Sequence, residues 1–177
     1  MRAMTETEFW ELIESFDWEH SGDDEAVVAP AVETLAGKTI DDINAFTDHL
    51  SRLLFNLDTR EHARYTYLGE ANPDNGDDYI SADDFLYTRC VVVANGEKYY
   101  TKVLANPQHM PQDLEFEHLL YVAADAYERK TGEEYNYYCT QWDMESFSNV
   151  EGWAPNTNTT PGSATGKHVP PGNRRPV

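Results

Sequence analysis

The chain has 177 residues, with 32 acidic and 13 basic side chains and a formal net charge of −19. Its composition excludes the coiled-coil, collagen-like and disulfide-scaffold classes, and no stretch approaches the roughly 18 consecutive apolar residues of a membrane span. The length suits one domain of about 100–150 residues followed by a tail.

The charge is unevenly distributed along the sequence. Residues 152–177 contain three basic and no acidic side chains, so residues 1–151 carry a net charge of −22. Direct binding to nucleic acid is disfavoured, because that affinity depends on Lys and Arg side chains that replace counterions. The excess of carboxylates favours solubility, adaptation to salty surroundings, or a basic protein partner.

The first half of the chain predicts three strong helices. Thr5 and Glu8 form a Thr-x-x-Glu capping box at the start of the first. The second is expected over 24–36, where Pro30 should limit or kink the first turn. The third, over 39–57, has the longest apolar stripe and is therefore expected to be the central helix of the core.

The next part of the chain predicts shorter helices around a polar loop. Further helices are expected at 59–68, 82–94, 97–105 and 114–130. Residues 69–79 contain Pro, two Gly and a run of acidic and Asn residues, which is typical of a loop. Ser81 is expected to cap the helix at 82–94, and Asp113 the helix at 114–130. The sequence thus predicts an all-α, single-domain bundle of about six helices over residues 5–134.

The last part of the chain is not expected to be helical. Residues 135–153 are rich in Tyr and Trp but show no clean period, which predicts an irregular aromatic arm packed on the helices. Residues 154–177 are Pro, Gly, Asn, Thr and Ser with almost no apolar side chains, so we expect this tail to be disordered.

The two cysteines, Cys90 and Cys139, form no Cys-x-x-Cys pair. The N-terminus has no apolar signal segment, so we expect a cytoplasmic location and free thiols. Cys90 stands beside Val91 and Val92 in a predicted helix, which favours burial as a small hydrophobic residue.

No arrangement of residues supports a specific chemistry. The sequence lacks the HExxH zinc motif, the nucleophile elbow, the dinucleotide fingerprint and the P-loop. We therefore predict no catalytic residue, metal or cofactor. The acidic loop at 70–84 does not match an EF-hand, because Ala71 and Ala82 occupy two ligand positions when Gly76 is placed at position six. A looser cation site or a solvated turn remain the two alternatives for this loop.

Two groups of residues are candidates for an interaction surface. Asp83, Asp84 and Arg89 lie on the helix that follows the acidic loop, where Arg89 could reach back to the acids or bond another loop. A structural cap with a salt link is the alternative interpretation.

The second candidate group comprises Tyr137, Tyr138 and Trp142 of the arm, whose composition is typical of interfaces. The same residues would equally suit a lid over the helical core.

Four blocks of sequence, at 8–13, 43–46, 81–96 and 119–132, occur in the order of motifs found in a known family. The first reads Glu-Phe-Trp-Glu-Leu-Ile, and the last contains Ala126-Tyr127 followed by Thr131-Gly132. Together they resemble the bacterial domain of unknown function DUF4240 over about 5–134. Ala82 separates Ser81 from the two acids that usually follow directly, and 59–68 replaces an Ala-rich stretch. The resemblance implies a compact helical bacterial cytosolic domain, without an established activity or catalytic residues.

These observations give two hypotheses of function. The first is a non-enzymatic interaction module, of inhibitor or immunity type, that binds a basic protein. The alternative is a small enzyme or divalent-cation-dependent domain that uses the loop at 70–84 and Arg89. Mimicry of DNA is a third hypothesis, which requires carboxylates spaced like the phosphates of a nucleic acid. No membrane partner is expected.

Overall fold

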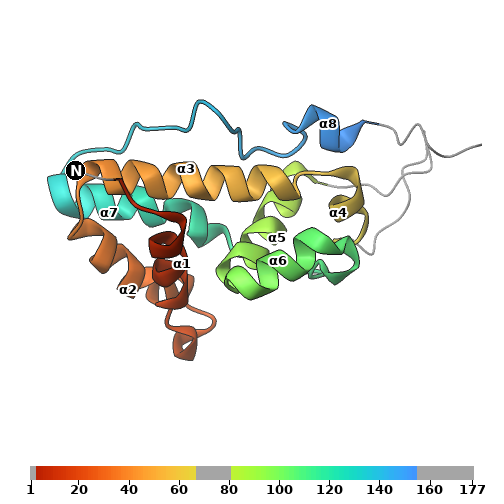
Figure 1. Ribbon diagram of the computed structural model, residues 1–177. Coiled ribbons are helices and arrows are strands. Elements are labelled where there is room, and N and C mark those ends of the chain that lie inside the picture. Colours follow the sequence, from red (N-terminus) through yellow and green to blue (C-terminus); the bar gives the residue numbers. More distant parts are fainter. Residues whose placement is uncertain (1–2, 67–80, 155–177) are drawn as a thin grey trace, which may run out of the picture.

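The computed structural model describes residues 3–66 and 81–154 (Figure 1), and within these ranges the chain is helical, without a strand. The α-helices are α1 (Glu6–Glu14), α2 (Asp24–Ala36), α3 (Ile40–Leu57), α4 (Arg60–Arg64), α5 (Ala82–Ala94), α6 (Glu97–Ala105), α7 (Val122–Thr131) and α8 (Val150–Trp153). Short 3-10 helices are η1 (Trp18–His20), η2 (Pro107–His109) and η3 (Glu117–Tyr121). Six of the described α-helices have nine residues or more, which confirms the predicted all-α fold of about six helices.

Helix α3 is the centre of the fold, as its apolar stripe predicted. It contacts α1, α2, α5 and α7, and its inward side chains are fully buried; Phe46, for example, packs 4.9 Å from the Phe9 ring centroid of α1. A capping box fixes the start of the helix, because the Thr39 hydroxyl accepts from the Asp42 amide and the Asp42 carboxylate accepts from the Thr39 amide. The equivalent box of Thr5 and Glu8 begins α1 as predicted.

Helix α2 covers the range predicted from the sequence, with Pro30 inside it. Pro30 lacks the N–H that would bond the Ala26 carbonyl, yet the helix continues to Ala36. Its apolar face, which includes the fully buried Val27 and Leu35, packs on α7 and compensates for the lost bond.

The helix predicted over 114–130 begins later than expected, and Asp113 does not cap it. Asp113 has a positive φ of 52°, and the chain then crosses α5 in an irregular conformation up to η3. Two tertiary bonds hold this crossing: the Phe116 amide donates to the Tyr87 carbonyl, and the Thr88 hydroxyl donates to the Leu114 carbonyl at 2.9 Å. The Phe116 ring packs 5.3 Å from Trp18, so a distant aromatic contact overrides the local helical pattern.

The C-terminal arm (residues 135–153) runs along α3 in the same direction as that helix, on its outer side (Figure 1). It is irregular up to Asn149 and ends in α8, which the sequence analysis did not predict. Residues 155–177, which belong to the predicted disordered tail, lie outside the described residues, as does the whole loop predicted at 69–79. None of the helices in the described ranges combines the length and hydropathy that a bilayer crossing requires.

Candidate functional site

The structure separates the residues that the sequence grouped on the helix at 82–94. Asp83 and Asp84 are exposed on the first turn of α5. Arg89 is fully buried, so its predicted place on an interaction surface is wrong. The reason is that α5 is enclosed by the chain on most sides: its buried residues run from Phe85 almost without interruption to Ala94.

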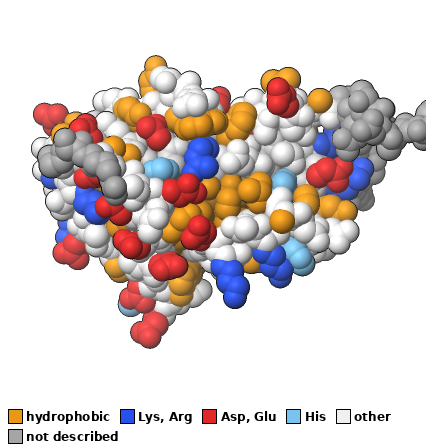
Figure 2. Space-filling view, in the orientation of Figure 1, with side chains coloured by type: hydrophobic (Ala, Val, Ile, Leu, Met, Phe, Trp, Pro, Cys, Tyr) orange, Lys and Arg blue, Asp and Glu red, His pale blue; other side chains and the backbone are white. Residues whose placement is uncertain are grey.

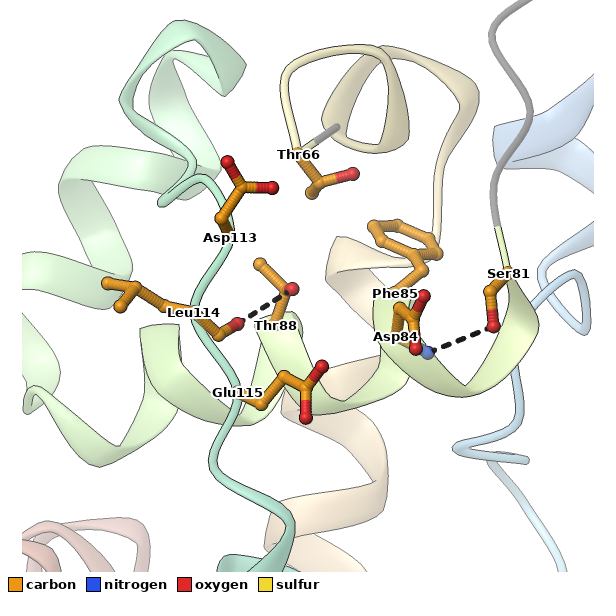
Figure 3. A pocket seen from close by; sticks show the side chains of 8 residues that line it. All are labelled: Thr66, Ser81, Asp84, Phe85, Thr88, Asp113, Leu114 and Glu115. Atoms are coloured by element: carbon orange, nitrogen blue, oxygen red, sulfur yellow. Dashed lines mark hydrogen bonds between the residues drawn. The ribbon is translucent and has the colours of Figure 1, made fainter. Parts of the chain in front are cut away.

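Asp84 contributes to a small acidic pocket at the start of α5 (Figure 3). The pocket has a volume of about 180 Å³ and is lined by Thr66, Ser81, Asp84, Phe85, Thr88, Asp113, Leu114 and Glu115. Ser81 caps α5 as predicted, since its hydroxyl accepts from the Asp84 amide at 3.4 Å. The other two carboxylates, Asp113 and Glu115, come from the segment that crosses α5.

The carboxylates of this pocket do not converge into a set of metal ligands. Among residues 3–66 and 81–154, no group of three or more His, Cys, Asp or Glu side chains could hold a metal ion. The alternative function relied on the loop at 70–84 together with Arg89. Residues 70–80 of that loop lie outside the described residues, and Arg89 faces away from solvent.

Arg89 instead joins α5, the end of α3 and the arm. Its Nη1 donates to the Leu54 carbonyl at 2.8 Å, and its Nη2 donates to the Met144 carbonyl at 3.0 Å and the Ser146 hydroxyl at 2.9 Å. The guanidinium also lies 4.7 Å from the Phe85 ring centroid. A hydrogen bond from Arg89 to another loop, one of the two alternatives that the sequence left open, is therefore what the structure contains.

Asp58, a fully buried residue at the C-terminal end of α3, holds the arm from the other side. Its carboxylate accepts four hydrogen bonds from the arm: from the amides of Phe147 and Asn149 at 3.0 and 2.9 Å, from the Ser148 hydroxyl at 3.3 Å and from the Trp153 indole at 2.8 Å. Sequence reasoning missed this residue, because an Asp between an apolar helix and Thr59 looks like an ordinary helix end.

The two buried charges, Arg89 and Asp58, influence each other without forming a direct ion pair. Burial lowers the pKa of Arg89, and the negative charge of Asp58 is the largest influence in the opposite direction. Arg89 bonds the Leu54 carbonyl, and the Asn149 side chain donates to the Phe55 carbonyl at 3.1 Å beside the Asp58 amide, so α5 and the arm both bond carbonyls in the last turn of α3.

Helix α8 approaches the end of α3 so closely that only glycine fits at position 152. A Cβ atom there would lie 2.9 Å from the Asp58 carbonyl oxygen and 2.8 Å from the Thr59 methyl group. We expect Gly152→Ala to lower the free energy of unfolding by about 1–3 kcal/mol, because backbone must move to relieve the clash. Urea denaturation measures this change, with the exposed neighbour Glu151→Ala as the control, expected within about 0.5 kcal/mol of wild type. Equal stability of both variants would contradict this docking of α8.

The first half of the arm is fixed by its tyrosines. The Tyr135 hydroxyl donates to the Asn44 side-chain oxygen at 3.2 Å and shares a 2.8 Å hydrogen bond with Thr47. The Tyr137 hydroxyl donates to the Asp48 carboxylate at 2.9 Å. Partial burial raises the pKa of Tyr135 to about 12, so this hydroxyl stays protonated over the physiological range. Tyr137 thus contacts α3 while remaining 39% exposed.

A pocket of about 500 Å³ lies between this part of the arm and α3. Its residues are Ser51, Tyr138, Cys139, Thr140, Trp142, Asp143, Met144 and Glu145. The predicted candidates Tyr138 and Trp142 are therefore brought together, with Tyr138 73% exposed and Trp142 half-buried. Asp83 and Asp84 do not line this pocket.

The two cysteines have different surroundings. Cys90 is fully buried as predicted, and burial raises the pKa of its thiol to about 12, whereas Cys139 is half-buried and lines the arm pocket. We expect iodoacetamide to alkylate Cys139 and spare Cys90 in the native protein, since the thiolate is the reactive form. Mass spectrometry of native and urea-denatured samples, with Cys139→Ser as the control, measures this. Rapid native modification of Cys90 would contradict its burial.

Acidic side chains gather at the end of the molecule formed by α1, η1 and α2. Residues 3–37 contain ten Asp and Glu and no Lys or Arg, and Figure 2 shows several of these carboxylates around the lower left of the view. Cations from elsewhere reach only some of them: Arg52 pairs with Glu6 at 3.0 Å and Arg129 with Glu33 at 3.8 Å. This end of the protein therefore presents a strongly negative surface.

Comparison with known proteins gives one result. Residues 4–129 match the model of a family described as a protein of unknown function, DUF4240. No match was found among curated proteins or among solved structures. The matched residues include Asp58 and Arg89, while the arm that both residues hold lies beyond them. Because the match covers well over half of the chain and agrees with the four motifs in the sequence, this protein belongs to the DUF4240 family.

Proposed function

We propose that this protein is a non-enzymatic interaction module that binds a basic protein partner through the C-terminal arm. The observation that carries the proposal is the surface of the arm. It combines exposed apolar side chains, Tyr138 at 73%, Phe147 at 46% and Val150 at 77%, with three carboxylates and no Lys or Arg. Aromatic side chains are enriched in protein interfaces and supply most of their binding energy.

The way the arm is held supports this role. Arg89 and Asp58 bond its second half, and Tyr135 and Tyr137 bond its first half to α3. An irregular segment fixed in this manner loses little conformational freedom when a partner binds, so more of the contact energy becomes affinity.

The charge of the remaining surface supports a basic partner. The carboxylates of α1, η1 and α2 create a negative field that would raise the rate of encounter with a cationic protein. An inhibitor or immunity protein directed at a cationic protein is the form of module that this charge favours.

The test is a pull-down from a lysate of the native host with the full chain as bait, washed at low and then at high salt. We expect a basic protein to remain at high salt, and to be lost with Tyr138→Ala. The matched control is Tyr121→Ala, which removes an exposed tyrosine of η3 away from the arm. The proposal would be contradicted if every captured protein were released by the high-salt wash, or if Tyr138→Ala and Tyr121→Ala retained the partner equally.

A further inference from the structure

We infer that the pocket between the arm and α3 receives an arginine side chain of the basic partner, an inference that rests on the proposed function. The pocket, of about 500 Å³, is within the usual range for a bound group and opens on the face that carries the exposed Tyr138.

A buried polar atom at this pocket lacks a partner. Ser51 is the residue of α3 that lines the pocket; it is fully buried, and its hydroxyl has no hydrogen-bond partner among the described residues. Buried hydroxyl groups are almost always bonded, because leaving one unpaired is costly. A donor that enters the pocket, such as a guanidinium N–H, would satisfy this oxygen.

The opposite wall offers the other two features that a guanidinium requires. Tyr138 and Trp142 provide aromatic faces, on which Arg stacks more favourably than other cations. Asp143 and Glu145 provide carboxylates, and neither forms an ion pair within the described residues. Arg89, which both carboxylates influence electrostatically, donates instead to the Leu54, Met144 and Ser146 oxygens.

The direct test titrates N-acetyl-arginine amide into the full chain and follows the backbone amide resonances of the residues that line the pocket by NMR, a readout that every variant retains. We expect saturable binding, and weaker binding of N-acetyl-lysine amide, because an ammonium lacks the planar face for stacking and the rigid fork of donors that a guanidinium presents. Asp143→Asn combined with Glu145→Gln is expected to weaken arginine binding about tenfold, which corresponds to about 1.4 kcal/mol. The control is Glu133→Gln combined with Glu134→Gln, two residues that precede the arm; this variant should bind arginine amide with nearly the wild-type affinity.

Ser51→Ala provides a readout that a purely structural role would not give. We expect it to weaken arginine binding while leaving the melting temperature unchanged or higher, because the unpaired hydroxyl contributes nothing to the free protein. No saturable arginine binding, or binding that is unaffected by Ser51→Ala and by Trp142→Leu, would overturn the inference.

Two further outcomes separate this inference from the proposed function. Suppose that the pull-down retains a basic partner that Tyr138→Ala loses, but that Ser51→Ala and Trp142→Leu still retain it. The pocket assignment then fails and the proposed function stands. If arginine amide binds more tightly after Arg174→Ala and Arg175→Ala, the chain's own basic residues occupy the pocket, which overturns its assignment to a partner.

Discussion

Replacement of Asp58 by asparagine is expected to lower the free energy of unfolding by about 3 kcal/mol or more. The carboxylate accepts four hydrogen bonds from the arm inside the protein. An amide keeps only one oxygen and turns an NH₂ group towards N–H donors, so at least one of the amide and indole N–H groups held by Asp58 loses its acceptor and faces another donor. The change also removes the largest electrostatic stabilisation of the buried Arg89. Urea denaturation measures the loss of stability.

Hydrogen exchange locates the effect of Asp58→Asn. Amides of 144–153 should lose protection first, because the arm detaches before the helices unfold. The control is Asp48→Asn, since Asp48 also accepts from an arm residue, Tyr137, but is partly exposed; its cost should stay below about 1 kcal/mol. Equal stability of the two variants would show that the buried bonds of Asp58 contribute little.

Replacement of Arg89 by methionine is expected to lower the free energy of unfolding by a similar amount, about 3 kcal/mol. The apolar side chain has a comparable length, but the Leu54 and Met144 carbonyls and the Ser146 hydroxyl all lose their donor. Arg89→Lys keeps the charge, and its stability should lie between those of Arg89→Met and wild type, because a single ammonium nitrogen cannot occupy both the Nη1 and the Nη2 position. Denaturation curves of both variants give the comparison.

Two controls make this second prediction specific. Arg52→Met breaks the surface pair of Arg52 with Glu6 and should cost no more than about 1 kcal/mol. The double variant of Asp58→Asn and Arg89→Met should be more stable than the sum of the single changes predicts, by about 1 kcal/mol or more, because each single change leaves the other charge buried alone. Simple additivity would mean that the two charges act on the arm independently.

The helices and their starts could be predicted because the signals are local. The hydroxyls of Thr5, Thr39 and Ser81 each accept from an amide three residues ahead, so each cap is complete within one turn of chain. The apolar stripe of α3 likewise identified the central helix without knowledge of its neighbours. The prediction of α7 failed at its start, where Phe116 packs on the distant Trp18.

The candidate site could be predicted only in part. The composition of the arm indicated Tyr137, Tyr138 and Trp142, and the structure places the last two at one pocket. Arg89 was grouped with Asp83 and Asp84 because all three lie on the helix that follows the acidic loop, whereas the structure buries it. Nothing near it in sequence indicated otherwise, since its acceptors lie 35, 55 and 57 residues away.

The sequence by itself therefore determined the all-α class, the caps of α1 and α5, the central helix and the family. Only the tertiary structure decided that the arm lies along α3, that Asp58 and Arg89 hold it from within, and that Ser51 lines a pocket beneath the arm. The physical reason is the range of the interactions. Caps and stripes form between residues a few positions apart, whereas the bonds of Asp58 span 89 to 95 residues and exist only once the chain has folded.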